Sequence, residues 1–187
     1  MNARTRWLVL ALALTAGCGY NTIQTYDEQV NAAESQIKVQ LQRRADLIPN
    51  LVETVKGYAK QEQTIFTEVA EARAKLAGAV QSNDLEKMGA ANAALTAPLG
   101  RLLAIAENYP QLKSDANFRA LQDQLEGTEN RIAVARQDYN EAVNRYNAYI
   151  RRFPAVVTAN VIGKKPRPYF ELQTPGAAEA PKVDFSK

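Results

Sequence analysis

The chain has 187 residues, which fits one domain with short appendages, and its 23 basic and 20 acidic residues give a formal charge of +3. It contains no histidine and a single cysteine, Cys18. These absences exclude a Ser-His-Asp triad, a histidine-liganded zinc site, an internal disulfide and a paired-cysteine redox motif. The small net charge gives little electrostatic footprint for nucleic-acid binding.

The first eighteen residues have the features of a bacterial lipoprotein signal. Arg4 and Arg6 precede residues 7–16, a stretch that is apolar apart from Thr15. Ten helical residues span about 15 Å, half of a bilayer core, so this stretch predicts a signal peptide and not a transmembrane helix. The sequence LTAGC at residues 14–18 resembles a lipobox, in which small residues precede a cysteine that becomes acylated.

We therefore expect removal of residues 1–17, with Cys18 as an acylated N-terminus that binds membrane lipid and residues 18–21 as a short tether. Cleavage removes two arginines and lowers the formal charge to +1. By resemblance to known sorting signals, the absence of aspartate at position 19 favours the outer membrane, if the cell has one. The alternatives are a soluble protein with an incidental cysteine or a short uncleaved anchor.

Apolar residues recur at helical spacing from residue 22 to residue 153. The first helix begins near Thr22, and its apolar face continues in phase past Pro49. This pattern fits either one kinked helix of about sixty residues or a break near residues 46–50, with Asn50 and Glu53 as a capping box. We expect the break, because a helix of that length would extend about 90 Å with no partner along its outer third.

The second helix is expected to end near Val80, and the third to begin at a cap formed by Asn83 and Glu86. The third helix contains Pro98, which should kink or split it, and it ends before Pro110.

The fourth helix is expected to begin at Ser114 and to end at Phe153, before Pro154. Its apolar residues alternate at spacings of three and four, which is typical of bundle packing. They are Phe118, Leu121, Leu125, Thr128, Ile132, Ala135, Tyr139, Ala142, Tyr146, Tyr149 and Phe153. The pattern of residues 22–153 thus predicts an all-α, antiparallel up-down four-helix bundle with long helices. Residues 154–187 are predicted to form a proline-rich tail that is partly extended and partly disordered.

Several segments of this sequence resemble the LemA family. They are QLQRRADLIPNLVETVKGYAK from Gln40, AENYPQL from Ala106, NFRALQDQLEGTENRIAVARQDYNEAVNRY from Asn117 and PKVDF from Pro181. The resemblance implies a helical bundle that is tethered to a bacterial membrane and lies mostly outside the cytoplasm. By this resemblance, many family members have an uncleaved N-terminal transmembrane helix, whereas this chain has a lipobox in that place. The resemblance implies no established biochemical activity.

Catalysis is not expected from the charged residues. Glu126, Glu129, Arg131 and Arg136 form a dense group on the fourth helix, but their spacing predicts a solvated face. A di-metal carboxylate site in a bundle usually needs Glu-x-x-His pairs, and the chain has no histidine. We therefore expect no catalytic residue, no cofactor and no metal.

The two connections at residues 45–50 and 108–115 are expected at the end of the bundle away from the membrane. Their apolar residues are Leu47, Ile48, Pro49, Tyr109 and Pro110. These residues either cap the bundle core or form a docking surface for an envelope protein of unknown identity.

Three basic residues follow the bundle near its membrane end: Lys164, Lys165 and Arg167. They form either a patch that binds an anionic membrane surface or part of a solvated linker. Residues 168–170 are expected to fold back onto the bundle.

The sequence favours a membrane-anchored, extracytoplasmic lipoprotein that acts as a scaffold or docking module in the bacterial cell envelope. One alternative is a carboxylate-based envelope or cell-wall enzyme, which would need two facing, desolvated carboxylates. Another is a bundle that binds or remodels membrane surfaces, which would need an exposed apolar stripe on one helix. A nucleic-acid partner is not expected.

Overall fold

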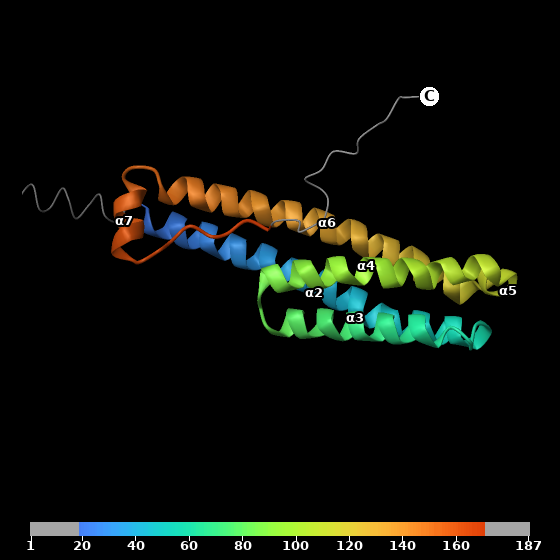
Figure 1. Ribbon diagram of the computed structural model, residues 1–187. Coiled ribbons are helices and arrows are strands. Elements are labelled where there is room, and N and C mark those ends of the chain that lie inside the picture. Colours follow the sequence, from blue (N-terminus) through green and yellow to red (C-terminus); the bar gives the residue numbers. More distant parts are fainter. Residues whose placement is uncertain (1–18, 171–187) are drawn as a thin grey trace, which may run out of the picture. The chain divides into compact units, whose positions relative to one another are not determined.

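The computed structural model of the protein describes residues 19–170 (Figure 1). Its regular elements within that range are all helices, which confirms the predicted fold class. They are α2 (Tyr20–Tyr58), α3 (Gln63–Gln81), α4 (Leu85–Asn108), α5 (Pro110–Ser114), α6 (Ala116–Ile150) and α7 (Ala155–Val161). In this part of the chain, no helix is both long and apolar enough to cross a bilayer. The predicted signal peptide, Cys18 and residues 171–187 lie outside the described residues.

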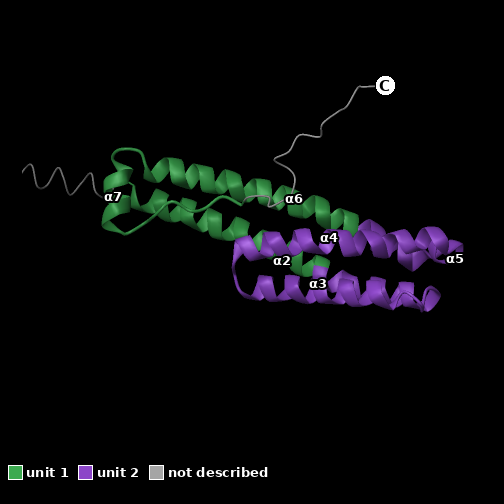
Figure 2. Ribbon diagram, viewed as in Figure 1, with its two compact units in different colours: residues 1–44, 125–170 green, residues 45–124, 171–187 purple. Residues whose placement is uncertain are grey.

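The chain divides into two compact units (Figure 2). Among the described residues, unit 1 contains residues 19–44 and 125–170, and unit 2 contains residues 45–124. Helices α2 and α6 each contribute to both units, whereas α3, α4 and α5 belong to unit 2 and α7 belongs to unit 1.

The predicted break near residues 46–50 is wrong, because α2 continues through Pro49. Proline has no backbone N–H, so the carbonyl of Ala45, four residues earlier, has no helical donor from that position. The Nε–H of Arg73 on α3 donates to this carbonyl at an N···O distance of 3.2 Å. A side chain from a neighbouring helix thus supplies the bond that proline cannot make. Helix α4 likewise continues through Pro98, so of the two predicted outcomes, a kink or a split, the split is absent.

The caps of α4 and α6 are the aspartates that directly follow the predicted caps. Asp84 and Asp115 each accept a hydrogen bond from the backbone N–H three residues later, at 3.1 Å and 2.9 Å. They replace the predicted Asn83 and Ser114. Asn83 instead has a φ of 55°, a left-handed conformation that asparagine tolerates at a turn.

Unit 2 contains the end of α2, α3, α4, the short α5 and the start of α6. Apart from α5, these segments alternate in direction along the chain (Figure 1). This arrangement is compatible with the predicted up-down bundle. The hydroxyl of Tyr58, at the end of α2, donates to Asp115 Oδ2 at 2.9 Å, which links that end to the cap of α6. The large buried apolar residues of unit 2 include Ile48, Leu51, Val55, Phe66, Val69, Leu76, Met88, Leu95, Leu99, Leu102, Leu112 and Phe118.

In unit 1, α2 and α6 pack along the predicted apolar seams. The buried residues of this core are Ile23, Val30, Ile37, Leu41, Leu125, Ile132, Ala135, Tyr139, Ala142, Val143, Tyr146 and Ile150. Tyr26 and Tyr149 meet edge to face, with ring centroids 5.3 Å apart. The prediction for the end of the fourth helix is wrong, because α6 ends at Ile150 and Phe153 is 85% exposed.

Candidate functional site

The first of the two predicted docking connections does not exist as a loop. Leu47, Ile48 and Pro49 lie within α2, where Ile48 is buried, Leu47 is half-buried and Pro49 is exposed. Ile48 therefore belongs to the core of unit 2, so of the two alternatives for this residue only core packing fits its burial.

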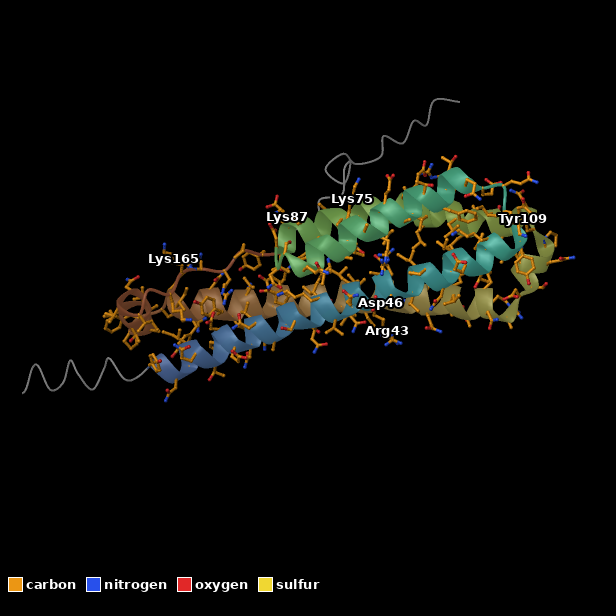
Figure 3. The ribbon with its side chains drawn as sticks, turned by 90° about the horizontal axis from the view of Figure 1, so that it is seen from below. Arg43, Asp46, Lys75, Lys87, Tyr109 and Lys165 are labelled. Atoms are coloured by element: carbon orange, nitrogen blue, oxygen red, sulfur yellow. The ribbon has the colours of Figure 1, made fainter. Side chains whose placement is uncertain are left out.

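The second predicted connection contains a short helix. Tyr109 lies between α4 and α5 and is half-buried (Figure 3). The exposed Pro110 is the first residue of α5. Because Asp115 binds the hydroxyl of Tyr58, this connection lies beside the end of α2 and not beside residues 45–50.

The three predicted basic residues divide into two that are paired and one that is exposed. They lie in residues 164–170, an extended segment that we call the strap. Lys164 Nζ lies 2.5 Å from Asp27 Oδ2, and Arg167 Nη2 lies 2.9 Å from Asp27 Oδ1. Arg167 also donates to Asn31 Oδ1 at 2.9 Å. The geometry gives Lys164 and Arg167 a structural role in place of a free basic patch, while Lys165 is exposed (Figure 3).

Asp27 is the centre of this ion-pair cluster. Asp27 is buried, with only 8% of the residue exposed. Burial opposes its ionisation, but the hydrogen bonds and positive charges of Lys164 and Arg167 outweigh burial and hold the pKa of Asp27 below its ordinary value. The cluster therefore remains charged at neutral pH and ties the strap to the first helix.

A repeated Tyr-Asn pair on α6 holds the other side of the strap. Asn147 donates to the carbonyl of Arg167 at 2.9 Å and accepts from its N–H at 2.8 Å. Seven residues earlier, Asn140 makes the same two bonds with Phe170, at 3.1 Å and 2.8 Å. Each asparagine amide thus satisfies both polar groups of one backbone residue, as a neighbouring strand would.

The tyrosine of each pair adds one more bond. Tyr146 donates to the carbonyl of Lys165 at 3.2 Å, and Tyr139 donates to the carbonyl of Pro168 at 3.0 Å. Burial raises the pKa of both hydroxyls, so both remain protonated donors.

The spacing of the two pairs matches the strap. Seven helical residues rise about 10.5 Å, and three extended residues span about 10 Å. Positions 140 and 147 of α6 therefore face positions 170 and 167 of the strap, which runs antiparallel to the helix. Phe170 ends the described strap, 9% exposed, with the Arg136 guanidinium 4.9 Å from its ring centroid. This confirms the prediction that residues 168–170 fold back.

Replacing Tyr146 with Phe should lower the free energy of unfolding by about 1 kcal/mol, because the carbonyl of Lys165 loses its donor while the ring keeps its packing. The measurement is the urea midpoint of the purified protein. Tyr169→Phe, at a strap position 48% exposed, is the matched control and should leave the midpoint unchanged. Equal midpoints for all three proteins would contradict the role given to the Tyr146 hydroxyl.

The four charged residues of α6 that are candidates for a catalytic group do not form one site, because two of them make separate structural contacts. Glu129 accepts a hydrogen bond from the buried Arg44, and Arg136 covers Phe170. Burial lowers the pKa of Arg44, and the Glu129 carboxylate partly offsets that effect. Glu126 and Arg131 are exposed. Among the described residues, no group of three or more cysteine, aspartate or glutamate side chains could hold a metal ion.

The sequence model of the LemA family matches residues 33–185. The chain belongs to the LemA family. The match includes α2 from residue 33 onward, all of α6, the Tyr-Asn pairs and the strap.

Three relatives of this LemA protein carry the name magnetosome protein MamQ. MamQ 1 and MamQ 2 of Paramagnetospirillum magneticum strain AMB-1 are each 30% identical over 191 aligned positions. MamQ of Magnetospirillum gryphiswaldense is 29% identical over the same length. Each alignment covers 90% of this chain and 70% of the relative.

The predictions for this LemA protein missed the polar contacts that fix the strap. The signal for them was the dipeptide Tyr-Asn at residues 139–140 and again at 146–147, one heptad later. A second signal was Asp27, a carboxylate on an apolar seam of the first helix.

Proposed function

We propose that this LemA-family protein is a lipid-anchored, extracytoplasmic helical scaffold of the bacterial cell envelope, which docks another envelope protein and catalyses no reaction. Support for the anchor comes from Gly19, the first described residue. Gly19 is buried, and its carbonyl accepts the N–H of Ile23 at 2.9 Å, so helix α2 starts at Tyr20, two residues after Cys18. An acyl chain on Cys18 would therefore hold the folded domain directly at the lipid surface.

Support for a scaffold comes from the use of the buried polar groups. Asp27, Arg44 and Asn147 are all buried, and each joins α2 or α6 to another segment of unit 1. Their hydrogen bonds fix the fold and are directed at other parts of the chain. A domain stiffened in this way presents its surface residues in constant positions, which lowers the entropy cost of docking a partner.

The docking surface that we propose is the end of unit 2 formed by residues 58–62 and 109–115. Tyr109 and Pro110 contribute apolar surface there, and the bond between Tyr58 and Asp115 fixes the two segments beside each other. The exposed side of Pro49 lies on α2 outside this surface.

The test combines the anchor and the docking surface in living cells. A photo-crosslinking amino acid replaces Tyr109 in the full chain, with or without Cys18→Ser, and the same amino acid at the exposed Gln81 is the control. We expect the protein in the membrane fraction with one discrete adduct from position 109 and none from position 81. Cys18→Ser should release the protein from the membrane and remove the adduct.

Two results would count against this function. Membrane retention of the Cys18→Ser variant would refute the lipid anchor. Adducts of equal yield from positions 109 and 81 would refute the docking surface.

A further inference from the structure

Helix α7 exposes its large apolar side chains and buries its small ones. The buried residues are Ala155, Thr158 and Ala159. Val157 and Val161 are 52% and 81% exposed, and Phe153, just before the helix, is 85% exposed. Val157 and Val161 are four residues apart on α7 and therefore lie on one side of that helix, and Phe153 lies in the turn just before it. We call Phe153, Val157 and Val161 the apolar stripe, and no described residue of unit 1 covers it.

The apolar stripe lies next to the first turn of α2. A Cβ atom placed on Gly19 would lie 3.5 Å from both Cα and Cβ of Ala155, so α7 packs directly on the first turn of α2. Figure 1 shows α7 beside the start of α2. The residue before Gly19 is Cys18. Any lipid attached there is therefore next to the helix that carries the stripe.

The charges around the stripe suit an anionic surface. Residues 155–161 (AVVTANV) include no charged side chain. Arg151 and Arg152 directly precede the stripe and are exposed, and Lys165 follows it and is also exposed. Arginine and lysine side chains can keep their charged groups among lipid phosphates while neighbouring apolar side chains enter the acyl region.

The position of α7 is fixed by the contacts that follow it. The N–H of Lys164 donates to the carbonyl of Ala159 at 2.9 Å, and the N–H of Gly163 donates to that of Asn160 at 3.3 Å. This is the Schellman pattern, and Gly163 has the required positive φ of 71°. This turn directs Lys164 toward Asp27. The ion-pair cluster that holds the strap therefore also fixes the C-terminal end of α7.

We propose that the apolar stripe of Phe153, Val157 and Val161 is a membrane-contact surface that inserts into the headgroup region of an anionic phospholipid bilayer. The inference builds on the proposed function, because the bilayer is the one to which Cys18 is attached. It adds a second, non-covalent contact that orients unit 1 on the lipid surface. An anchor alone would leave the domain free to rotate about a single point.

The test uses the full chain reconstituted into vesicles of phosphatidylcholine with one quarter phosphatidylglycerol. Trp7→Phe removes the single tryptophan, and a new tryptophan is then introduced as Val157→Trp or, as the control, Val134→Trp on α6. The two positions are matched, since their valines are 52% and 58% exposed. Acyl chains brominated near the headgroup quench indoles that enter the bilayer.

We expect quenching at position 157 to exceed quenching at position 134 by at least twofold. Arg151→Glu with Arg152→Glu should reduce quenching at position 157 to the level of the control. Equal quenching at the two positions in vesicle-bound protein would overturn the inference and leave the proposed anchor intact. Preferential quenching at position 157 in a chain whose Cys18 carries no acyl group by mass spectrometry would support the inference and refute the anchor. A chain that does not float with vesicles at all would refute both.

Discussion

Replacing Asp27 with Asn is expected to lower the free energy of unfolding by about 2–3 kcal/mol and to release the strap. The amide keeps the size of the side chain but leaves Lys164 and Arg167 without their shared anion. The expected loss is smaller than for a fully buried pair, because the two cations are 29% and 35% exposed. Urea unfolding measures the stability, and amide hydrogen exchange of residues 164–170 measures the release.

The effect of Asp27→Asn should depend on pH in one direction. Because the pKa of Asp27 is lowered in the folded protein, its contribution is complete above the ordinary value of about 4 and is lost as the pH falls through the folded value. The stability difference between wild type and variant should therefore be constant from about pH 5 to pH 8 and should shrink below about pH 4. Asp138→Asn removes the same charge from an exposed site on α6 and should not reproduce this profile. If both variants changed the stability equally across this pH range, the role given to Asp27 in the ion-pair cluster would be contradicted.

Pro49→Ala and Arg73→Ala are expected to show a coupling of about 1 kcal/mol in a double-mutant cycle. In the wild type, Arg73→Ala leaves the Ala45 carbonyl without the donor that replaces the missing proline N–H, at a cost of about 1–2 kcal/mol. Pro49→Ala restores that N–H within α2 and should itself raise stability by about 1–2 kcal/mol. In the Pro49→Ala background, Arg73→Ala should therefore cost less.

The matched control for this cycle is Lys75→Ala, at an exposed position on the same helix as Arg73 (Figure 3). Its effect should add to that of Pro49→Ala within about 0.5 kcal/mol. Additivity of Arg73→Ala with Pro49→Ala would show that the side chain does not compensate for the proline. The four proteins of each cycle can be compared by urea unfolding at neutral pH.

Periodicity was sufficient to predict the helices and most of their buried faces. The predicted apolar residues from Phe118 to Tyr146 are largely buried, and so is the apolar face of α2 from Ile23 to Leu41. Glu34 and Lys38, four residues apart on α2, form an ion pair at 2.6 Å. These features depend on residues three or four apart, so a single sequence contains them.

The errors arose where distant residues decide the outcome. Pro49 alone indicates a break, and only the approach of Arg73 from α3 allows the helix to continue. Likewise Lys164 and Arg167 alone indicate a basic patch, and only Asp27, on a helix far away in sequence, turns them into a structural cluster. Partners of this kind cannot be predicted before the arrangement of the segments is known.

The division of the chain also has a consequence for the order of folding. The described part of unit 2 is one uninterrupted stretch, residues 45–124, whereas unit 1 combines residues 19–44 with residues 125–170. During synthesis unit 2 can complete its contacts early, but Asp27 must wait for partners that are 137 and 140 residues later in the chain. Closing so long a loop is the entropically costly step, and it becomes favourable once α6 is available to align the strap. We therefore expect the strap to be the last part of the fold to form its contacts.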